Sequence, residues 1–193
     1  MTSTLNPSLL ILIPLAPLIG SILAGFFGTK FLGNQLSREA CHRITILGVA
    51  IACGLSIYVL KEVLAGARFN GNIYEWMRFG DELVLAIGFL IDPLTSMMMV
   101  VVTFVSLMVH IYTIGYMEED EGYSRFFSYI SLFTFAMLML VMSNNFLQLF
   151  FGWEAVGLVS YLLIGFWYTK STAIFANMKA FLVNRVGDFG FIL

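Results

Sequence analysis

Charged residues are scarce in this chain: 10 Lys and Arg and 12 Asp and Glu make up 11% of its 193 residues, and the formal net charge is −2. The sequence has no basic cluster, which argues against binding to nucleic acid. Cysteine is scarce as well. Cys41 and Cys53 lack the paired cysteine or histidine spacing of a disulfide framework or a metal site, so we expect two reduced structural thiols.

Hydrophobic residues dominate instead, at 60% of the chain, and the mean hydropathy is +0.90. Both values are typical of a polytopic membrane protein and exclude an ordinary soluble domain. The first apolar run lacks the positively charged region of a secretory signal, so we expect an uncleaved span. The fold class predicted is an all-α polytopic membrane protein with about six transmembrane helices: Leu9–Phe27, Ile44–Leu64, Pro93–Tyr116, Phe126–Met142, Phe146–Trp167 and Thr172–Leu193.

One sizeable loop separates the second and third predicted helices, and its pattern changes from helical to alternating. Tyr74, Trp76 and Phe79 precede Gly80-Asp81, and a β-rich run from Leu83 to Ile91 follows. This pattern predicts a β-hairpin on the membrane surface. After the hairpin, Asp92-Pro93 is a helix start, with aspartate as the cap and proline in the first turn.

Loop lysines and arginines give an expected orientation. One side of the membrane has Lys61, Arg68 and Arg78, diluted by Glu62, Glu75, Asp81 and Glu82, and the other side has Lys30, Arg38, Arg43, Arg125 and Lys170. Because positive loop residues favour the cytoplasmic side, we expect the N-terminus outside.

Glu154 lies inside the fifth predicted helix, in a stretch of about 22 residues that is otherwise free of charge. Holding an ionisable group near the bilayer centre costs on the order of 3 kcal/mol or more, so such residues usually face a bundle interior or a water-filled path. Glu154 is therefore a candidate for an ion or proton route. The competing interpretation is a carboxylate that only forms an interhelical hydrogen bond.

The sixth segment carries three charges: Lys179, Arg185 and Asp188. They cost roughly 8–10 kcal/mol on insertion, whereas the apolar residues return only about 3–6 kcal/mol, so this helix must lie among other protein helices. At 100° per residue, Asn177, Asn184 and Asp188 form one polar stripe and Lys179 points about 180° away from Asp188. A helix that is polar on both sides is expected to have partners on both sides.

A tight turn at residues 169–171 makes the fifth and sixth helices antiparallel. If they touch, Glu154 and Arg185 lie at the same depth, each about 15 residues from the turn. Arg185 and Asp188, spaced i, i+3, can neutralise each other.

A change of partner can switch such groups between holding and releasing a proton, because desolvation and neighbouring charges act in opposite directions. Arg185 and Asp188 are equally consistent with an ion pair that only holds helices together. His110 in the third helix is a further candidate, either as a proton relay or as a hydrogen bond to a neighbour.

Three sequence strings are specific enough to indicate a family. They are Phe89-Leu90-Ile91-Asp92-Pro93-Leu94, the stretch from Val109-His110-Ile111-Tyr112 to Met117, and the stretch from Gly152-Trp153-Glu154-Ala155-Val156-Gly157 to Trp167. From about Ile73 to the last residue, the chain closely resembles subunit L of bacterial NADH-quinone oxidoreductase (respiratory complex I), the counterpart of mitochondrial NADH dehydrogenase subunit 5. The large Mrp-type antiporter subunits share the glutamate-bearing fifth helix.

The resemblance implies a proton-translocating membrane-arm subunit built as a larger antiporter-like bundle. Glu154 matches the family's channel glutamate, whose lysine partner on a broken seventh helix would lie beyond Leu193. We therefore expect an N-terminal fragment that does not pump alone. We divide it into residues 1–64 with two helices, 65–117 with the hairpin and third helix, and 126–193 as the start of the translocating core.

The resemblance also implies the cellular setting. The chain would act as a subunit of a translocase that couples NADH oxidation and quinone reduction to proton transfer, in the bacterial inner membrane. It would contact other membrane-arm subunits and lipid, and would bind no metal or cofactor itself, because the flavin and iron–sulfur clusters belong to other subunits. The alternative is a subunit of an Mrp-type cation/proton antiporter.

Overall fold

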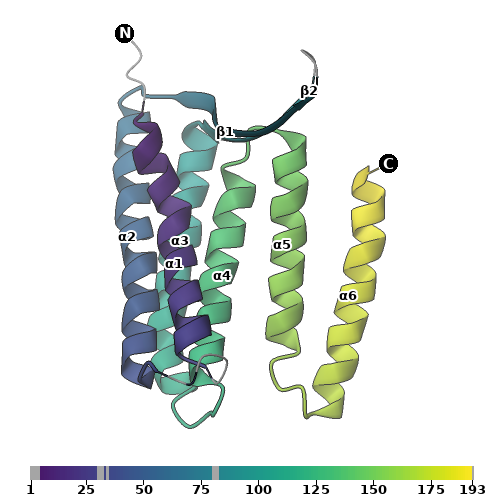
Figure 1. The fold of residues 1–193 in the computed structure, drawn as a ribbon. Coiled ribbons are helices and arrows are strands. Elements are labelled where there is room, and N and C mark those ends of the chain that lie inside the picture. Colours follow the sequence, from purple (N-terminus) through teal and green to yellow (C-terminus); the bar gives the residue numbers. More distant parts are fainter. Residues whose placement is uncertain (1–4, 30–32, 34, 80–82, 193) are drawn as a thin grey trace.

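The computed structural model describes residues 5–29, 33, 35–79 and 83–192 of the chain. In chain order its elements are α1 (Pro7–Phe27), α2 (Arg38–Leu64), β1 (Phe69–Phe79), β2 (Leu83–Ile91), α3 (Pro93–Tyr116), α4 (Tyr123–Val141), α5 (Phe146–Ile164) and α6 (Ser171–Ile192). Long helices stand roughly side by side, with the hairpin across one end of the bundle (Figure 1). The predicted all-α polytopic fold with a hairpin between its second and third helices is confirmed.

Five helices within the described residues are long and apolar enough to cross a membrane, namely α1 to α5. The sixth, α6, carries the three charges that made its insertion alone unfavourable. Helix bounds differ from the predictions by a few residues at polar ends: α2 begins at Arg38 and α5 ends at Ile164. Lys30, the turn at Gly80-Asp81, Glu82 and Leu193 lie outside the described residues.

Side-chain caps set the starts of several helices. The Asp92 carboxylate accepts a hydrogen bond from the Thr95 amide at 2.7 Å, which confirms the predicted cap of α3. The Asn145 side chain does the same for α5, where it accepts from the Gln148 amide at 2.8 Å. Each cap satisfies an amide that has no partner within its own helix.

The bundle core is built by α1 to α4. Helix α1 packs against α2 and α4, α2 packs against α3, and α4 packs against α5. Ser21 and Ser128 bind α1 to α4 reciprocally, because each hydroxyl donates to the other residue's carbonyl oxygen at 2.8 Å. Ser131 adds a bond to the Pro17 carbonyl, also at 2.8 Å. Such small polar residues let helices approach closely where lipid supplies no hydrophobic driving force.

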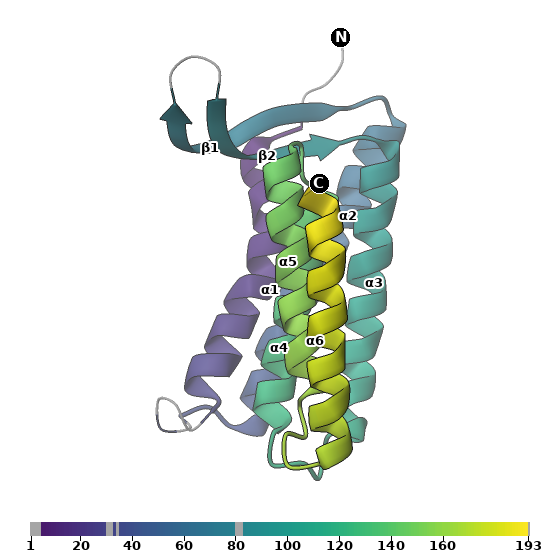
Figure 2. The same ribbon diagram turned by 90° about the vertical axis from the view of Figure 1, so that its right-hand side faces the viewer.

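The hairpin is tied to the turn between α4 and α5. Its strands pair antiparallel from Phe69↔Ile91 to Phe79↔Leu83, with two irregularities in register. The Gly88 amide donates to the Gln148 side-chain oxygen at 2.9 Å, and the Asn145 side chain donates to the Ala86 carbonyl at 3.0 Å. Figure 2 shows the hairpin extending across the ends of several helices. The start of α5 is therefore held to β2 by two hydrogen bonds.

The loop cations separate as the sequence predicts. Arg38, Arg125 and Lys170 lie at the starts of α2, α4 and α6, whereas Lys61 and Arg68 lie at the hairpin end of the bundle. Which end faces the outside stays a prediction, and so does the division into residues 1–64, 65–117 and 126–193.

Candidate functional site: an intramembrane charge cluster

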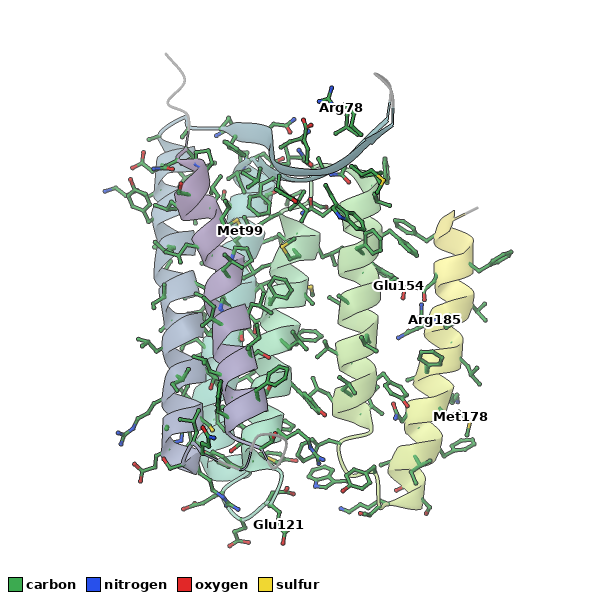
Figure 3. The ribbon with its side chains drawn as sticks, viewed as in Figure 1. Arg78, Met99, Glu121, Glu154, Met178 and Arg185 are labelled. Atoms are coloured by element: carbon green, nitrogen blue, oxygen red, sulfur yellow. The ribbon has the colours of Figure 1, made fainter. Side chains whose placement is uncertain are left out.

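The close packing of α5 against α4 turns Glu154 toward α6. Gly152 lies so close to α4 that a Cβ built on it would be 2.8 Å from the Leu140 Cα atom. Glu154 follows two residues later, about 200° around the helix, and therefore points away from α4. Figure 3 shows the side chains of Glu154 and Arg185 extending toward each other across the space between α5 and α6.

The polar stripe of α6 faces α5, as its spacing predicts. The Asn177 amide lies against Gly165, and the Asn184 amide nitrogen lies 3.8 Å from the position of a Cβ on Gly157. Asp188 is buried on the same face. Gly157 on α5 and Gly165 at its end therefore make room for the asparagines on α6, and this packing sets the spacing of the two helices.

Glu154, Arg185 and Asp188 form one charge cluster, which we call the charge triad. The Arg185 Nη1 atom donates a hydrogen bond to Glu154 Oε2. The same atom also donates to Asp188 Oδ2, at 3.3 Å. Helices α5 and α6 touch here, and Glu154 and Arg185 lie at the equal depth predicted for that case; Arg185 and Asp188, spaced i, i+3, also pair. One guanidinium thus contacts two carboxyl groups.

Burial differs among the three side chains. Those of Glu154 and Asp188 are 19% and 10% exposed, whereas that of Arg185 is 44% exposed. The Arg185 guanidinium also lies over the Phe181 ring, 5.0 Å from its centroid. The carboxylates are therefore more enclosed between the helices than the cation, which is partly exposed.

Sequence reasoning missed Trp153 as a member of the site. Its indole nitrogen donates to Asp188 Oδ1 at 3.0 Å, so Asp188 keeps one neutral donor in addition to Arg185. The Trp153 side chain is about half exposed, and its indole N–H group is a donor that needs an acceptor. The position of Trp153 next to Glu154 was therefore the available signal, but its partner on another helix was not visible in the sequence.

Lys179 is not part of the triad. Its side chain is exposed on the opposite face of α6, as the 100° spacing predicts. Among the residues that the structure describes, it forms no ion pair. Its role stays a prediction.

His110 lies elsewhere, fully buried on α3 and 6.0 Å from the Phe127 ring. Its Nδ1 atom is 2.7 Å from the Ser106 carbonyl oxygen, and the Ser106 hydroxyl is 2.5 Å from that of Thr134 on α4. Its Nε2 atom has no partner within the described residues. Among the described residues, these hydrogen bonds do not connect His110 to the triad, so a proton-relay role for His110 stays a prediction.

Chemically, the triad can exchange partners. A carboxylate held between helices is costly without a partner, and Arg185 supplies that partner for Glu154. Asp188 competes for the same guanidinium atom. No group of three or more His, Cys, Asp or Glu side chains is placed to hold a metal ion in the part of the chain that the structure describes.

Comparison with protein-family models gives two matches. Residues 76–127 match the model described as NADH-ubiquinone oxidoreductase (complex I), chain 5 N-terminus, and residues 143–193 match the model described as NADH:quinone oxidoreductase/Mrp antiporter, TM. The second match covers all three residues of the triad.

Individual relatives agree with these matches. NADH-quinone oxidoreductase subunit L of Neisseria meningitidis (serogroup A) is 62% identical over 96% of this chain and 27% of its own length. Subunit L of Rickettsia typhi is 45% identical over 98% of the chain and 28% of its own length. NADH-ubiquinone oxidoreductase chain 5 of Marchantia polymorpha is 49% identical over 95% of the chain and 27% of its own length.

The chain thus spans about a quarter of the length of the curated relatives that it matches. Similarity of this degree extends over nearly all of its residues, including the hairpin and the triad-bearing helices. By these matches, the chain belongs to the family of NADH-quinone oxidoreductase subunit L and its chain 5 counterparts.

Proposed function

We propose that this chain contributes to proton translocation in the membrane arm of an NADH-quinone oxidoreductase. The observation that carries the proposal is the charge triad, in which Glu154 shares one guanidinium with Asp188 between α5 and α6. The relatives are named as NADH-quinone oxidoreductase subunits, so the proton movement would be coupled to electron transfer from NADH to quinone.

Glu154 is the proton-carrying group in this proposal. While Arg185 contacts it, the carboxylate is held ionised. When Arg185 moves toward Asp188, Glu154 loses its cation and takes up a proton, because an unpaired carboxylate in low dielectric is the costlier state. The return of Arg185 releases the proton. Trp153 supports Asp188 throughout by its hydrogen bond.

The wider setting belongs to the same proposal. The chain would act within an NADH:quinone oxidoreductase translocase, together with other membrane-arm subunits. Flavin and iron–sulfur chemistry would take place in other subunits, and the site would be in the bacterial inner membrane with the N-terminus outside.

A Glu154→Gln variant of the full-length subunit within its complex tests the proposal. NADH-driven acidification and NADH-to-quinone electron transfer are measured on the same membranes, with assembly checked on native gels. Glu119→Gln is the matched control, because Glu119 is an exposed carboxylate outside the helices. We expect the number of protons moved per electron to fall several-fold for Glu154→Gln in an assembled complex, and to stay unchanged for the control.

Unchanged coupling in assembled Glu154→Gln would contradict the proposal. Loss of assembly with both Glu154→Gln and the charge-conserving Glu154→Asp would favour a scaffold in which the triad only holds α5 and α6 together.

A second candidate function is cation/proton antiport, since the family model matched by residues 143–193 also describes Mrp antiporters. The energy source separates the two. Ion exchange driven by an imposed gradient without NADH would support the antiporter, whereas transport that requires NADH and quinone supports the first proposal.

A further inference from the structure

Helix α6 has a second face that α5 leaves uncovered. Phe175, Lys179, Leu182 and Val186 recur along it at spacings of i, i+4, i+7 and i+11, and they fall within an arc of about 60° at 100° per residue. Phe175, Leu182 and Val186 are 68%, 59% and 74% exposed. We call this row the outer seam of α6.

The outer seam lies opposite the stripe that packs on α5. At 100° per residue, its centre is about 180° from that of Asn177, Asn184 and Asp188. Within the described residues, α5 is the element that packs along α6, and Figure 1 shows α6 at the edge of the bundle. Arg185 and Asp188 pair with each other, and Arg185 also pairs with Glu154 on the α5 side. Of the three charged residues of α6, Lys179 is the one that faces away from α5.

Lys179 is in an unfavourable place if lipid covers the outer seam. It is the ninth residue of α6, about 12 Å along the axis from the start of the helix. Ionisable residues at such depth nearly always face protein or a water-filled cavity, and they pair with one another or with backbone carbonyls. Spacing of i, i+4, i+7 and i+11 is the pattern of a helix-packing seam, here with a cation at its centre.

We infer that the outer seam of α6 docks a second transmembrane helix that carries an Asp or Glu facing Lys179. Charge complementarity selects this occupant. A second copy of the chain is disfavoured, because two-fold pairing through the same seam would bring the two Lys179 ammonium groups together. Lipid acyl chains offer no counter-charge at this depth. The inference goes beyond the proposed function and does not depend on proton transfer by the triad.

Photo-crosslinking tests the docking in the full-length protein within native membranes. A benzoylphenylalanine is placed at Leu182 on the seam, and at Ala176, an exposed position on α6 outside the seam, as the control. We expect Leu182 to give a crosslinked peptide from an apolar helix with an intramembrane Asp or Glu, at several-fold higher yield than Ala176. Crosslinks from Leu182 to lipid alone, to a second copy of the chain, or to a helix without a carboxylate would overturn the inference.

Substitution of Lys179 gives an independent test, because a facing carboxylate and a lipid environment predict opposite changes in the assembled fraction. If a carboxylate faces Lys179, Lys179→Leu leaves that carboxylate unpaired and lowers the assembled fraction several-fold, while Lys179→Arg retains it. If lipid covers the seam, Lys179→Leu removes a lone charge and raises the assembled fraction. An unchanged or raised yield with Lys179→Leu would therefore refute the docked carboxylate.

Discussion

Gly152→Ala, which adds a single methyl group, tests the close packing of α5 on α4 that turns Glu154 toward α6. A Cβ built there lies 2.8 Å from the Leu140 Cα atom, 2.9 Å from its nitrogen and 3.0 Å from its Cβ. Carbon atoms in good contact are about 3.5–4.0 Å apart. Because two of the three neighbours are backbone atoms, no side-chain rotation relieves the clash, and Gly152→Ala requires α4 and α5 to separate.

The magnitude follows from two opposing effects. Overpacking of this kind typically costs about 1–3 kcal/mol, and a clash with backbone belongs at the upper end of that range. Replacing glycine by alanine within a helix returns up to about 1 kcal/mol through higher helix propensity. We therefore expect Gly152→Ala to lower the free energy of unfolding by about 1–2 kcal/mol.

Gly157→Ala is the matched control on the same helix. A Cβ there has only an ordinary contact, 3.8 Å from the Asn184 amide nitrogen, so its expected effect is neutral or stabilising. The assay is the temperature midpoint at which the full-length protein in detergent loses its monodisperse fraction. Equal midpoints for Gly152→Ala and Gly157→Ala would refute the close α4–α5 approach.

Three further predictions concern other contacts. Arg185→Gln should reduce assembly on native gels, because two carboxylates lose their shared cation, and Arg185→Gln with Asp188→Asn should recover part of it. Two hydrogen bonds lower the pKa of Asp120 below its ordinary value: the larger effect comes from the Trp167 side chain and the smaller from the Gly122 amide. Asp120 therefore contributes its full stabilisation above the ordinary pKa of an aspartate, and this stabilisation is lost as the pH falls through the lowered pKa of the folded state. Trp167 fluorescence should report this pH-dependent change, and the change should be absent in Asp120→Asn. Ser128→Ala should weaken α1–α4 packing by about 0.6–1.7 kcal/mol, measured as a lower thermal midpoint than that of the unsubstituted protein.

Local sequence signals were sufficient for the elements of the fold. Apolar runs of membrane-spanning length predicted α1 to α5, and Asp92-Pro93 predicted the start of α3, because capping depends on neighbouring residues alone. The alternating pattern predicted the hairpin, although its ties to Gln148 and Asn145 were not predicted. Those ties depend on the α4–α5 turn, which is distant along the chain.

The two-sided character of α6 and the equal depth of Glu154 and Arg185 also came from the sequence, since helical spacing determines both angle and depth. Tertiary structure decided which groups meet at that depth. It brought Trp153 to Asp188, gave Arg185 two acceptors, left Lys179 on the uncovered face and enclosed His110 apart from the triad. The physical reason is that a helix's own periodicity specifies the direction of each side chain, whereas the partner at the end of that direction depends on how all the helices pack.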